Sequence, residues 1–411
     1  MNILFIHQNF PAQFKHLAPA LVNAGHDVTA LILAKTDASQ WNGVKLVPYS
    51  VSRGNAKEAH PWTVDFETKV IRGEACLRAS LQLKHQGYYP DVIVAHPGWG
   101  ESLFVKEAWP KAKLKLYCEF FYQASGADAG FDPEFSSSDP ADAGRVTLKN
   151  ANILLQFQQA DAACSPTLWQ ANTFPEHISK KISVIHDGID TDVLRPNPDV
   201  QFVLNSGRLL TRKDELITFV SRTLEPYRGF HVLMRSLPTL LKERPNAEVL
   251  IAGKEGGIGY GPQPTSGISW KQQFISEVFP KLEESQRTRV HFFNTIPYDQ
   301  FLSLLQVSTV HVYLTYPFVL SWSLLEAISV GCAVVASDTP PLQEAITHDE
   351  NGLLVDFFNA EALAESVCRL LDNPLRRAEL GARAREFAKA KYDLKRVCLP
   401  KQVIWALDDP I

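Results

Sequence analysis

Short runs of apolar residues alternate with longer amphipathic stretches along the first half of the chain. The runs have strand length, and we expect strands over Asn2–Ile6, Asp27–Leu33, Asp91–Ala95, Lys115–Glu119 and Ala162–Cys164. Apolar positions spaced three and four apart predict helices over Phe14–Ala24, which ends at Gly25, and over Glu101–Trp109. Strands that alternate with helices indicate a parallel sheet covered on both faces.

The same alternation begins again in the second half. We expect strands over Leu216–Val220, Ala247–Ala252, Arg289–Phe293, Val310–Leu314 and Ala333–Ser337. Helices are predicted over Gly229–Glu243, Tyr298–Val307, Leu324–Val330 and Glu361–Lys391. The pattern predicts an α/β chain of two Rossmann-like domains that face a central cleft. We expect the domains at 1–195 and 196–391, with 392–411 packing back on the first domain.

Two long loops interrupt this pattern. Gly126–Asp142 is rich in Gly, Asp, Pro and Ser, and Gly253–Gly267 is rich in glycine. Loops of this length are often lids or binding loops, and the alternative is a surface insertion without function.

Composition narrows the class of protein. A length of 411 residues favours two domains, and 45% hydrophobic with 21% charged residues is typical of a globular protein. The net charge of −4 comes without a long Lys/Arg run, so we expect no nucleic-acid partner. We find neither a signal-peptide pattern nor an apolar run of bilayer length. Six scattered cysteines indicate free thiols, so we expect a cytoplasmic protein, with peripheral contact at the inner membrane face left open.

The segment Ser221–Gly229 directly follows a predicted strand and precedes a helix. Ligands of doubly wound sheets bind at the carboxyl ends of strands. Arg222 and Arg228 there, with Gly229 opening a helix, would suit a diphosphate, because guanidinium groups and helix N-termini bind phosphate oxygens. The alternative is a pair of surface arginines in a turn.

The segment Thr315–Ala327 also follows a strand and runs into a helix, which Ser321 or Ser323 would cap. Glu326 lies near the start of that helix, where its carboxylate can accept hydrogen bonds from both hydroxyls of a ribose. The alternative is a glutamate that only complements the helix dipole.

These segments make the second half similar to the family 4 glycosyltransferases, which have the GT-B fold. The resemblance implies that Arg222 and Arg228 hold a donor diphosphate and that Glu326 binds the ribose. The family pattern Glu-x7-Glu aligns on Phe318 to Glu326, so Phe318 replaces the first glutamate. Further along the chain, the family pattern is also matched by Ala333–Ser337, Glu344 and Asn351–Val355. The expected donor-binding positions are Phe318, Ser321, Trp322, Ser323, Leu324, Glu326, Gly253, Lys254 and Ile296.

The first half resembles a subgroup of that family through His7–Phe14, Asp91–Glu101 and His186–Thr191. His96, at the end of a predicted strand, would contact the transferred sugar or the acceptor, and the alternative is a structural histidine. We place His96 with Arg222 and Arg228 as catalytic residues. The acceptor-side candidates are His7, Gln8 and Asn9 in the first loop, with Glu101 and Glu119 as candidate bases.

The resemblance implies a retaining glycosyltransferase that moves a sugar from a nucleoside-diphosphate sugar, a UDP- or GDP-sugar, to an acceptor hydroxyl. We expect no metal and no cofactor, with the arginines and a helix N-terminus stabilising the leaving diphosphate. The acceptor would be a glycan, a lipid-linked molecule or a small molecule. The alternatives are a non-catalytic nucleotide-sugar-binding subunit and a sugar-nucleotide epimerase or hydrolase. The first loop lacks GxGxxG, which argues against a dehydrogenase.

Overall fold

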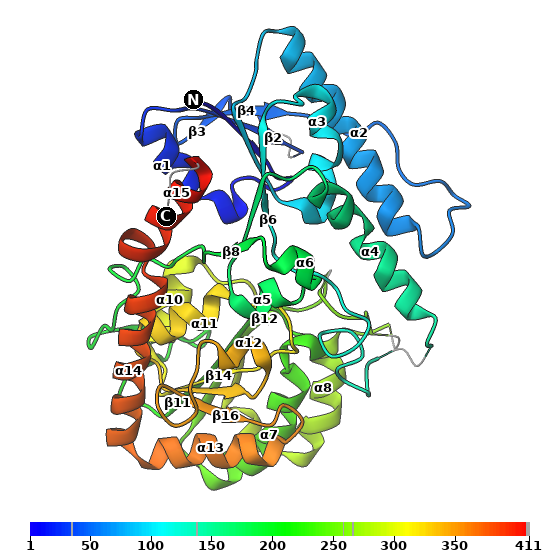
Figure 1. Cartoon of the computed structure of the whole chain (residues 1–411). Helices are drawn as coiled ribbons and strands as arrows, with labels where there is room; N and C mark the ends of the chain where they lie inside the picture. The colour runs from blue at the N-terminus through cyan, green and yellow to red at the C-terminus, as the bar shows by residue number, and fades with distance from the viewer. Residues whose placement is uncertain (34–35, 137–138, 258, 265–266, 408–411) are drawn as a thin grey trace. The chain divides into compact units, whose positions relative to one another are not determined.

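The chain divides into two compact units. The structure, a computed structural model, describes residues 1–33, 36–136, 139–257, 259–264 and 267–407. Unit 1 consists of residues 1–129, 137–188 and 394–411, and unit 2 consists of residues 130–136 and 189–393. The divisions after residues 188 and 393 lie near the expected boundaries at 195 and 391, whereas segment 130–136 was expected in the first domain. Figure 1 shows both units and labels many of their helices and strands.

Unit 1 is built on an eight-stranded sheet with β1 and β5 at its centre. Its strands pair in parallel, except that β3 is antiparallel to β4. In spatial order they are β3 (Gln40–Trp41), β4 (Val44–Pro48), β2 (Asp27–Ile32), β1 (Asn2–Ile6), β5 (Val92–Ala95), β6 (Lys113–Tyr117), β7 (Ala162–Ser165) and β8 (Ile182–Val184).

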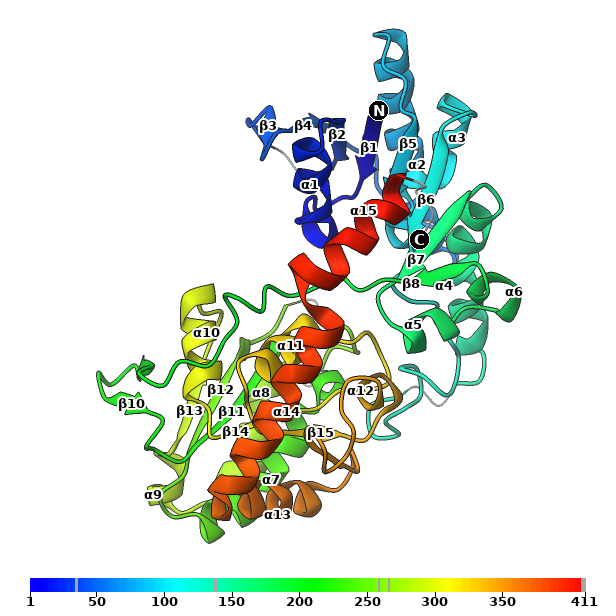
Figure 2. The same ribbon diagram turned by 60° about the vertical axis from the view of Figure 1, so that its left-hand side comes forward.

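Alternate side chains of β1 enter two different cores, because successive residues of a strand point to opposite faces. Ile3 and Phe5 pack with residues of α1 (Leu17–Asn23) and α15 (Leu399–Leu407). Leu4 and Ile6 pack with residues of α2 (Val64–His85), α3 (Val105–Ala108) and α4 (Asp142–Phe157). The last helix of the chain therefore belongs to unit 1, where it lies beside α1 (Figure 2). The remaining helical segments are η1 (Ala12–Phe14), η2 (Pro97–Trp99), η3 (Glu101–Phe104), α5 (Leu168–Asn172), α6 (Glu176–Ser179) and η6 (Leu394–Cys398).

Unit 2 is built on a six-stranded parallel sheet. Its spatial order is β13 (Val290–Phe293), β12 (Glu248–Lys254), β11 (Leu216–Thr223), β14 (Val310–Tyr313), β15 (Val334–Ser337) and β16 (Leu353–Val355). A separate antiparallel pair joins β9 (Gln201–Val203) and β10 (Leu209–Thr211).

Helices of unit 2 form two groups. In one group α7 (Phe230–Glu243) packs against α8 (Trp270–Val278) and α13 (Ala360–Asp372), and in the other α11 (Trp322–Ser329) packs against α14 (Pro374–Tyr392). The remaining helical segments are η4 (Pro226–Arg228), η5 (Phe279–Lys281), α9 (Glu284–Arg287), α10 (Tyr298–Val307) and α12 (Pro340–Gln343).

The predicted helices differ from the observed ones where turn-forming residues intervene. The stretch Glu361–Lys391 is two helices, because Pro374 lacks an N–H and disfavours helical backbone at Asn373. The Asn373 side chain accepts the N–H of Arg376 and caps the second helix. The stretch Glu101–Trp109 likewise divides into η3 and α3.

Segment 130–136, from the first of the two long loops, packs into unit 2 through buried polar and aromatic contacts. The Asp132 carboxylate accepts the Tyr316 hydroxyl at 2.7 Å and lies 3.2 Å from Nε2 of His231. Burial opposes ionisation of Asp132, but the bonds from His231 and Tyr316 outweigh it and lower its pKa. Glu134 accepts two bonds of 2.7 Å from Arg235. The Phe135 ring lies 5.1 Å from the Trp270 ring, so both ends of the segment are held.

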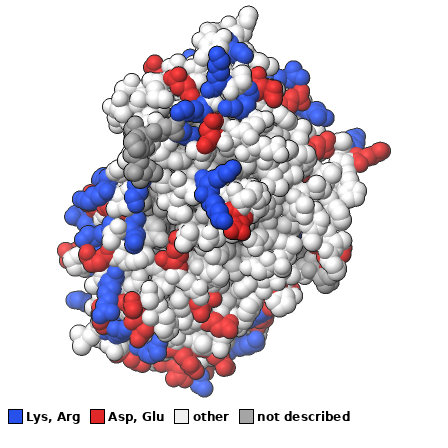
Figure 3. Space-filling model, in the orientation of Figure 1, with Lys and Arg blue, Asp and Glu red and all other residues white. Residues whose placement is uncertain are grey.

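All six cysteines are free thiols, and five of them are buried. None of the helices in the described part of the chain combines the length and apolarity needed to cross a lipid bilayer. In the view of Figure 3, basic and acidic side chains are interspersed over the surface, in keeping with the small net charge.

Gly229 joins η4 to α7, and we expect Gly229→Ala to lower the free energy of unfolding by about 2–4 kcal/mol. Its φ is +67°, and an added Cβ would lie 2.3 Å from Cβ of Leu314. Urea unfolding of the purified chain measures the change. Gly207→Ala is the control, because Gly207 has φ +84° but no neighbour within 4 Å of an added Cβ. Equal losses in the two variants would contradict the packing argument.

Candidate functional site

Each large sheet has a switch point, which is a strand whose two neighbours are reached by connections that run in opposite directions across the sheet. In unit 2, β12 lies on one side of β11 and β14 on the other, and in unit 1, β2 lies on one side of β1 and β5 on the other. Loops that leave the carboxyl ends of such neighbouring strands diverge, and ligands bind in the crevice that opens there. The candidate residues of each unit follow these strand ends.

Arg228 is the buried cation of the unit 2 crevice. It follows β11, its residue is only 7% exposed, and Nη1 donates to Oγ1 of Thr315, after β14, at 2.9 Å. Ser337, at the end of β15, accepts the N–H of Thr315 at 3.1 Å and donates to its carbonyl at 3.2 Å. Three neighbouring strands therefore set the position of one guanidinium.

Tyr260 brings Arg222 and Arg228 to one place. Cζ of the buried Arg228 lies 4.9 Å from the Tyr260 ring centre, and Cζ of the exposed Arg222 lies 5.9 Å from it. Glu225 accepts the backbone N–H groups of Tyr260 and Gly261, which ties this glycine-rich loop to the end of β11. Burial raises the pKa of the Glu225 carboxyl, and these two N–H groups oppose that rise. Neither Tyr260 nor Glu225 was assigned a role from the sequence.

The loop after β14 leads directly into the N-terminus of α11. Ser321 is the capping residue, and its Oγ accepts the N–H of Ser323 at 3.3 Å. Trp322 and Ser323 are half-buried, whereas the Leu324 side chain is fully buried in the core, so only its backbone remains available to a ligand. Glu326 accepts the hydroxyl of Tyr298, the first residue of α10, at 2.9 Å.

Phe318 stands where the family pattern has a glutamate, and it is buried among aromatic rings. Its ring centre lies 5.3 Å from that of Tyr227, 5.1 Å from that of Tyr260 and 5.8 Å from Cζ of Arg228. The guanidinium of Arg228 therefore meets the faces or edges of two aromatic rings, where a cation is attracted by the ring electrons.

Three further donor-side candidates lie at the ends of β12 and β13. Gly253 is buried within β12, and an added Cβ would lie 2.8 Å from the Ser221 carbonyl, so the strand requires glycine there. Lys254 is the exposed last residue of β12. Ile296 is not exposed: its side chain packs against the core that contains β9 and β10.

In unit 1, His7 after β1 meets His96 after β5, with ring centres 5.4 Å apart. His96 is 4% exposed, and its Nδ1 accepts the N–H of Gly98 at 3.1 Å. Its Nε2 lies 3.6 Å from Oε2 of Glu119, which follows β6, and makes no shorter hydrogen bond within the described residues. Gln13 donates to the other Glu119 oxygen at 3.1 Å.

Burial, together with the neighbouring His96, lowers the pKa of His7 to about 3, so this imidazole is neutral at physiological pH. Asn9 donates its backbone N–H to Nδ1 of His7 at 3.0 Å, and Gln8 between them is half-buried. Burial opposes ionisation of Glu119, but His96 and Gln13 outweigh it and lower the pKa of its carboxyl. A carboxylate and two imidazoles thus share the crevice of unit 1.

Of these residues, His96 and Glu119 line a cavity of about 280 Å³ that lies within unit 1, whereas His7, Gln8 and Asn9 are not part of its lining. Besides Asp65, its lining includes two hydrogen-bonding groups, three aromatic rings and three cations that sequence reasoning missed. These residues are His96 and Glu119, then Trp99, Phe120 and Tyr122, then Lys69, Arg72 and Lys149. The cations come from the helices α2 and α4, which are distant in sequence.

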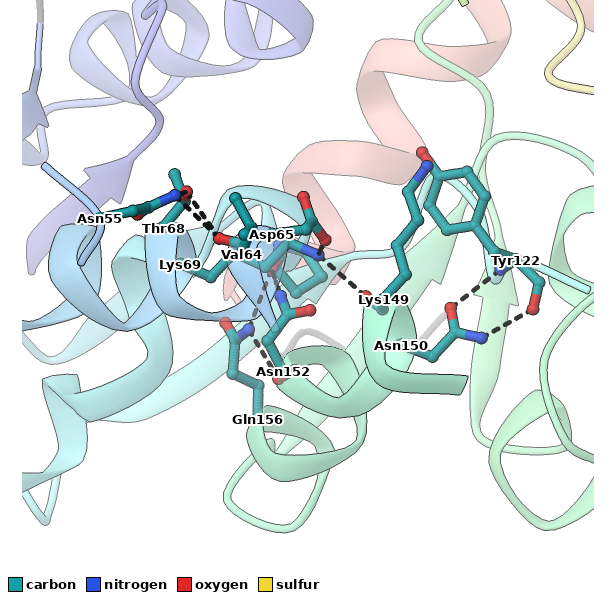
Figure 4. A network of polar contacts seen from close by, with 11 residues as sticks. Asn55, Val64, Asp65, Thr68, Lys69, Tyr122, Lys149, Asn150, Asn152 and Gln156 are labelled. Carbon is teal, nitrogen blue, oxygen red and sulfur yellow. Dashed lines mark hydrogen bonds and ion pairs between the residues drawn. The ribbon is translucent and has the colours of Figure 1, made fainter. Parts of the chain in front are cut away.

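Helix α4 makes hydrogen bonds to two segments that line this cavity, and Figure 4 draws these bonds as dashed lines. Asn150 accepts the backbone N–H of Tyr122 and donates to its carbonyl, at 3.0 and 2.7 Å. Asn152 and Gln156 donate to the Pro97 carbonyl at 2.7 and 2.9 Å, which holds the loop that carries His96. Three residues of a single helix therefore position two parts of the cavity.

Glu101 does not line this cavity. It is 1% exposed, and in the part of the chain that the structure describes neither carboxylate oxygen has a hydrogen-bond partner from another residue. Burial raises the pKa of Glu101 to about 7. The structure therefore brings together Glu119 and His96 but leaves the second candidate base outside the cavity wall.

The chain contains one Asp-x-Asp triplet, Asp190-Thr191-Asp192, an arrangement that metal-dependent transferases use to hold a divalent ion. Here Oδ1 of Asp190 accepts the N–H groups of Asp192 and Val193, and the Thr191 hydroxyl bonds to Asp393. Within the described residues, His, Cys, Asp and Glu side chains nowhere form a group of three that would suit a metal ion.

Two family models match consecutive parts of the chain. Residues 24–194 match the model described as Glycosyl transferase family 4 group, and residues 204–387 match Glycosyl transferases group 1. A glycogen synthase of Mycobacterium tuberculosis is 24% identical over 97% of this chain and 92% of its own. A D-inositol 3-phosphate glycosyltransferase of Corynebacterium efficiens is 26% identical over 51% of this chain. The matched part spans about half (47%) of that relative's length.

Solved structures resemble the fold at lower identity. A sucrose-phosphate synthase from Thermosynechococcus elongatus superposes with a TM-score of 0.72 at 17% identity, covering 98% of each chain. HepE of Anabaena, solved in complex with UDP-glucose, has a TM-score of 0.67 at 15% identity, covering 100% of each chain. Together with the two α/β units and their parallel sheets, these neighbours confirm the GT-B fold predicted from the sequence.

We expect Glu101→Gln to stabilise the protein at pH 8 but not at pH 5. The folded-state pKa of about 7 exceeds the usual 4.5, so the wild type loses stability as the pH rises between these values. The full shift corresponds to about 3 kcal/mol. Thermal unfolding at both pH values measures the difference. Glu107→Gln, at an exposed position on α3, is the control, and the same pH response in both variants would rule out the assignment.

Proposed function

The chain belongs to the family 4, group 1 glycosyltransferases, and we propose that it transfers a sugar, with retention, from a nucleoside-diphosphate sugar to an acceptor hydroxyl. The observation that carries the proposal is the convergence of Arg222 and Arg228 on Tyr260 at the end of β11. Arg228 also contacts Thr315 and Phe318 in the loop that leads into α11. Cations at the switch point of a parallel sheet, near a helix N-terminus, favour binding of a diphosphate.

Each donor group has a residue suited to it. Arg222 and Arg228 hold the diphosphate, and backbone N–H groups of Ser321–Leu324 add hydrogen bonds to the phosphate or sugar. Glu326 binds the ribose hydroxyls, with its carboxylate oriented by Tyr298. Gly253, Lys254 and Ile296 border the nucleoside. A UDP-sugar is the first donor to test, because HepE was solved with UDP-glucose, and a GDP-sugar is the second.

Phe318 gives the donor sugar an apolar neighbour where the family pattern has a carboxylate. Its buried position beside Tyr227 and Tyr260 leaves no acidic group at that point of the loop. Within unit 2 the sugar would therefore depend on the backbone of α11 for its polar contacts. His96 and Glu119, with His7, Gln8 and Asn9 nearby, would orient the acceptor hydroxyl.

The proposed reaction needs no protein nucleophile. The bond between the anomeric carbon and the phosphate oxygen breaks as the acceptor oxygen bonds to the same face of that carbon. The acceptor proton passes to the departing phosphate oxygen. The protein contributes orientation and positive charge, which stabilise the leaving diphosphate without a metal ion.

One nucleoside diphosphate should raise the melting temperature of the full chain in a thermal-shift series with UDP, GDP, ADP, dTDP and CMP. A ligand that binds only the native state stabilises it by about 2.7 kcal/mol at a hundredfold excess over Kd. We expect the shift to persist in EDTA and to be lost in Glu326→Ala. Lys213→Ala, an exposed cation that precedes the amino end of β11, should retain it.

A shift that requires Mg²⁺ or Mn²⁺ would overturn the metal-independent mechanism. The absence of any shift would overturn the donor site. A shift without release of the nucleotide from its sugar, in the presence of candidate acceptors, would indicate a non-catalytic nucleotide-sugar-binding subunit.

Arg228→Ala should lower kcat/KM by roughly 30- to 150-fold, which corresponds to about 2–3 kcal/mol of transition-state stabilisation. The loss is expected because Arg228 is buried and oriented by Thr315. Nucleotide release from the donor identified above measures it, with Lys213→Ala again as the control. Unchanged kcat/KM would remove Arg228 from the site.

A further inference from the structure

Aromatic rings, rather than a carboxylate, hold the buried cation Arg228 in place. Within the described residues its guanidinium makes a single hydrogen bond, from Nη1 to Oγ1 of Thr315, and no ion pair. The ring centre of Tyr260 lies 4.9 Å from Cζ of Arg228, and that of Phe318 lies 5.8 Å from it. Ring electrons attract a cation but have no charge of their own. The positive charge of Arg228 is therefore held in position without being neutralised.

The buried Glu225 carboxylate holds the loop that carries the Tyr260 ring. Both of its oxygens accept the N–H of Tyr260, at 3.2 and 3.0 Å, and Oε2 also accepts the N–H of Gly261 at 3.2 Å. An added Cβ at Gly259 would lie 2.0 Å from Oε2, so the loop needs glycine there to approach this closely. Over the described ranges Glu225 forms no ion pair with Arg228, because its oxygens serve the loop instead.

The position of the Tyr260 ring suits the orientation of a ligand-binding guanidinium. A guanidinium presents its N–H donors in one plane, so the direction of that plane decides whether it can bind two phosphate groups together. Fixing the plane before binding reduces the conformational entropy that is lost when the ligand binds. The Tyr260 side chain is 41% exposed, so most of its ring area is not needed to complete the core. Its contact with Arg228 is therefore better explained by the site than by the fold.

We propose that Tyr260 is a positioning residue for the donor diphosphate: its ring orients the Arg228 guanidinium and leaves the charge available, and Glu225 holds the ring in place. The inference rests on the proposed function, because it concerns the diphosphate of that donor. Tyr260 acts through Arg228, so its effect follows the diphosphate and is independent of the base and the sugar. The probe for this role is consequently the diphosphate alone.

Calorimetric titration of the full chain with inorganic pyrophosphate, in EDTA, tests the proposal. Tyr260→Leu should weaken pyrophosphate binding roughly 3- to 30-fold, the usual effect of losing a cation–π contact at a partly desolvated site. Tyr260→Phe restores the ring without the hydroxyl and should recover the affinity that Tyr260→Leu loses. Tyr89→Leu is the matched control, because Tyr89 is an exposed tyrosine of unit 1, and it should bind pyrophosphate like wild type.

A double-mutant comparison separates positioning from mere support of the fold. Arg228→Lys keeps a positive charge that binds pyrophosphate, but its ammonium has no plane for the ring to orient. Adding Tyr260→Leu to Arg228→Lys should therefore change the affinity by less than about twofold. A ring that only supports the loop would cost the same factor in both backgrounds. Thermal unfolding without ligand is measured for each variant to confirm that it is folded.

The proposal is overturned if the wild type does not bind pyrophosphate, if Tyr260→Leu binds it like wild type, if Tyr260→Phe loses as much affinity as Tyr260→Leu, or if the loss is equal in the Arg228→Lys background. The nucleotide-induced thermal shift distinguishes this failure from failure of the transferase proposal. A nucleotide shift without a Tyr260 effect on pyrophosphate would leave the transferase standing and remove this role. Pyrophosphate binding that depends on Tyr260, with no nucleotide shift, would leave the diphosphate site without the transferase.

Discussion

Parallel pairing on both sides of β1 and of β11 is the constraint on which both candidate sites depend. A central strand in such a sheet has both faces covered and both edges hydrogen-bonded, so its side chains are used for packing. The polar side chains that can bind a ligand therefore lie in the residues that follow the carboxyl end of each strand. His7, His96 and Glu119 follow β1, β5 and β6, and Arg228 and Thr315 follow β11 and β14. Strand order brings the loops of each site to the same edge of its sheet.

Neutral hydrogen-bonding groups hold the walls of the unit 1 cavity, and charged groups face into it. Asn150, Asn152 and Gln156 fix the backbone of Tyr122 and Pro97 through amide bonds that add no net charge. The charged groups that line the cavity are Asp65, Lys69, Arg72, Glu119 and Lys149. In unit 2 a carboxylate has the structural role instead: Glu225 holds the loop of Tyr260 through its backbone N–H groups.

The strands were predictable because their apolar runs are short, buried and followed by turns. Asn2–Ile6 and the helix Tyr298–Val307 match the structure at both ends. Arg228, Glu326 and His96 could be proposed from the sequence because each lies in a segment that leads from a strand into a helix, and their roles stay predictions. Lys69, Arg72 and Lys149 were not, because a cation on a helix is ordinarily solvated and only tertiary packing of α2 against α4 turns these side chains inward. Tyr260 was missed for a related reason: its neighbours in the loop are mostly glycines, and its contact with Arg228 depends on Glu225.

The segment 130–136 makes unit 2 discontinuous in sequence. A gene fragment that encodes only residues 189–393 would lack Asp132, leaving the buried His231 and Tyr316 without their shared carboxylate. It would also expose the rings that Phe131 and Phe135 cover, and Arg235 would lose one of its two glutamates. The polypeptide therefore crosses between the units at four points rather than one. If unit 2 were exchanged between related chains at a single junction, the transferred sheet would lack segment 130–136, which covers part of its surface.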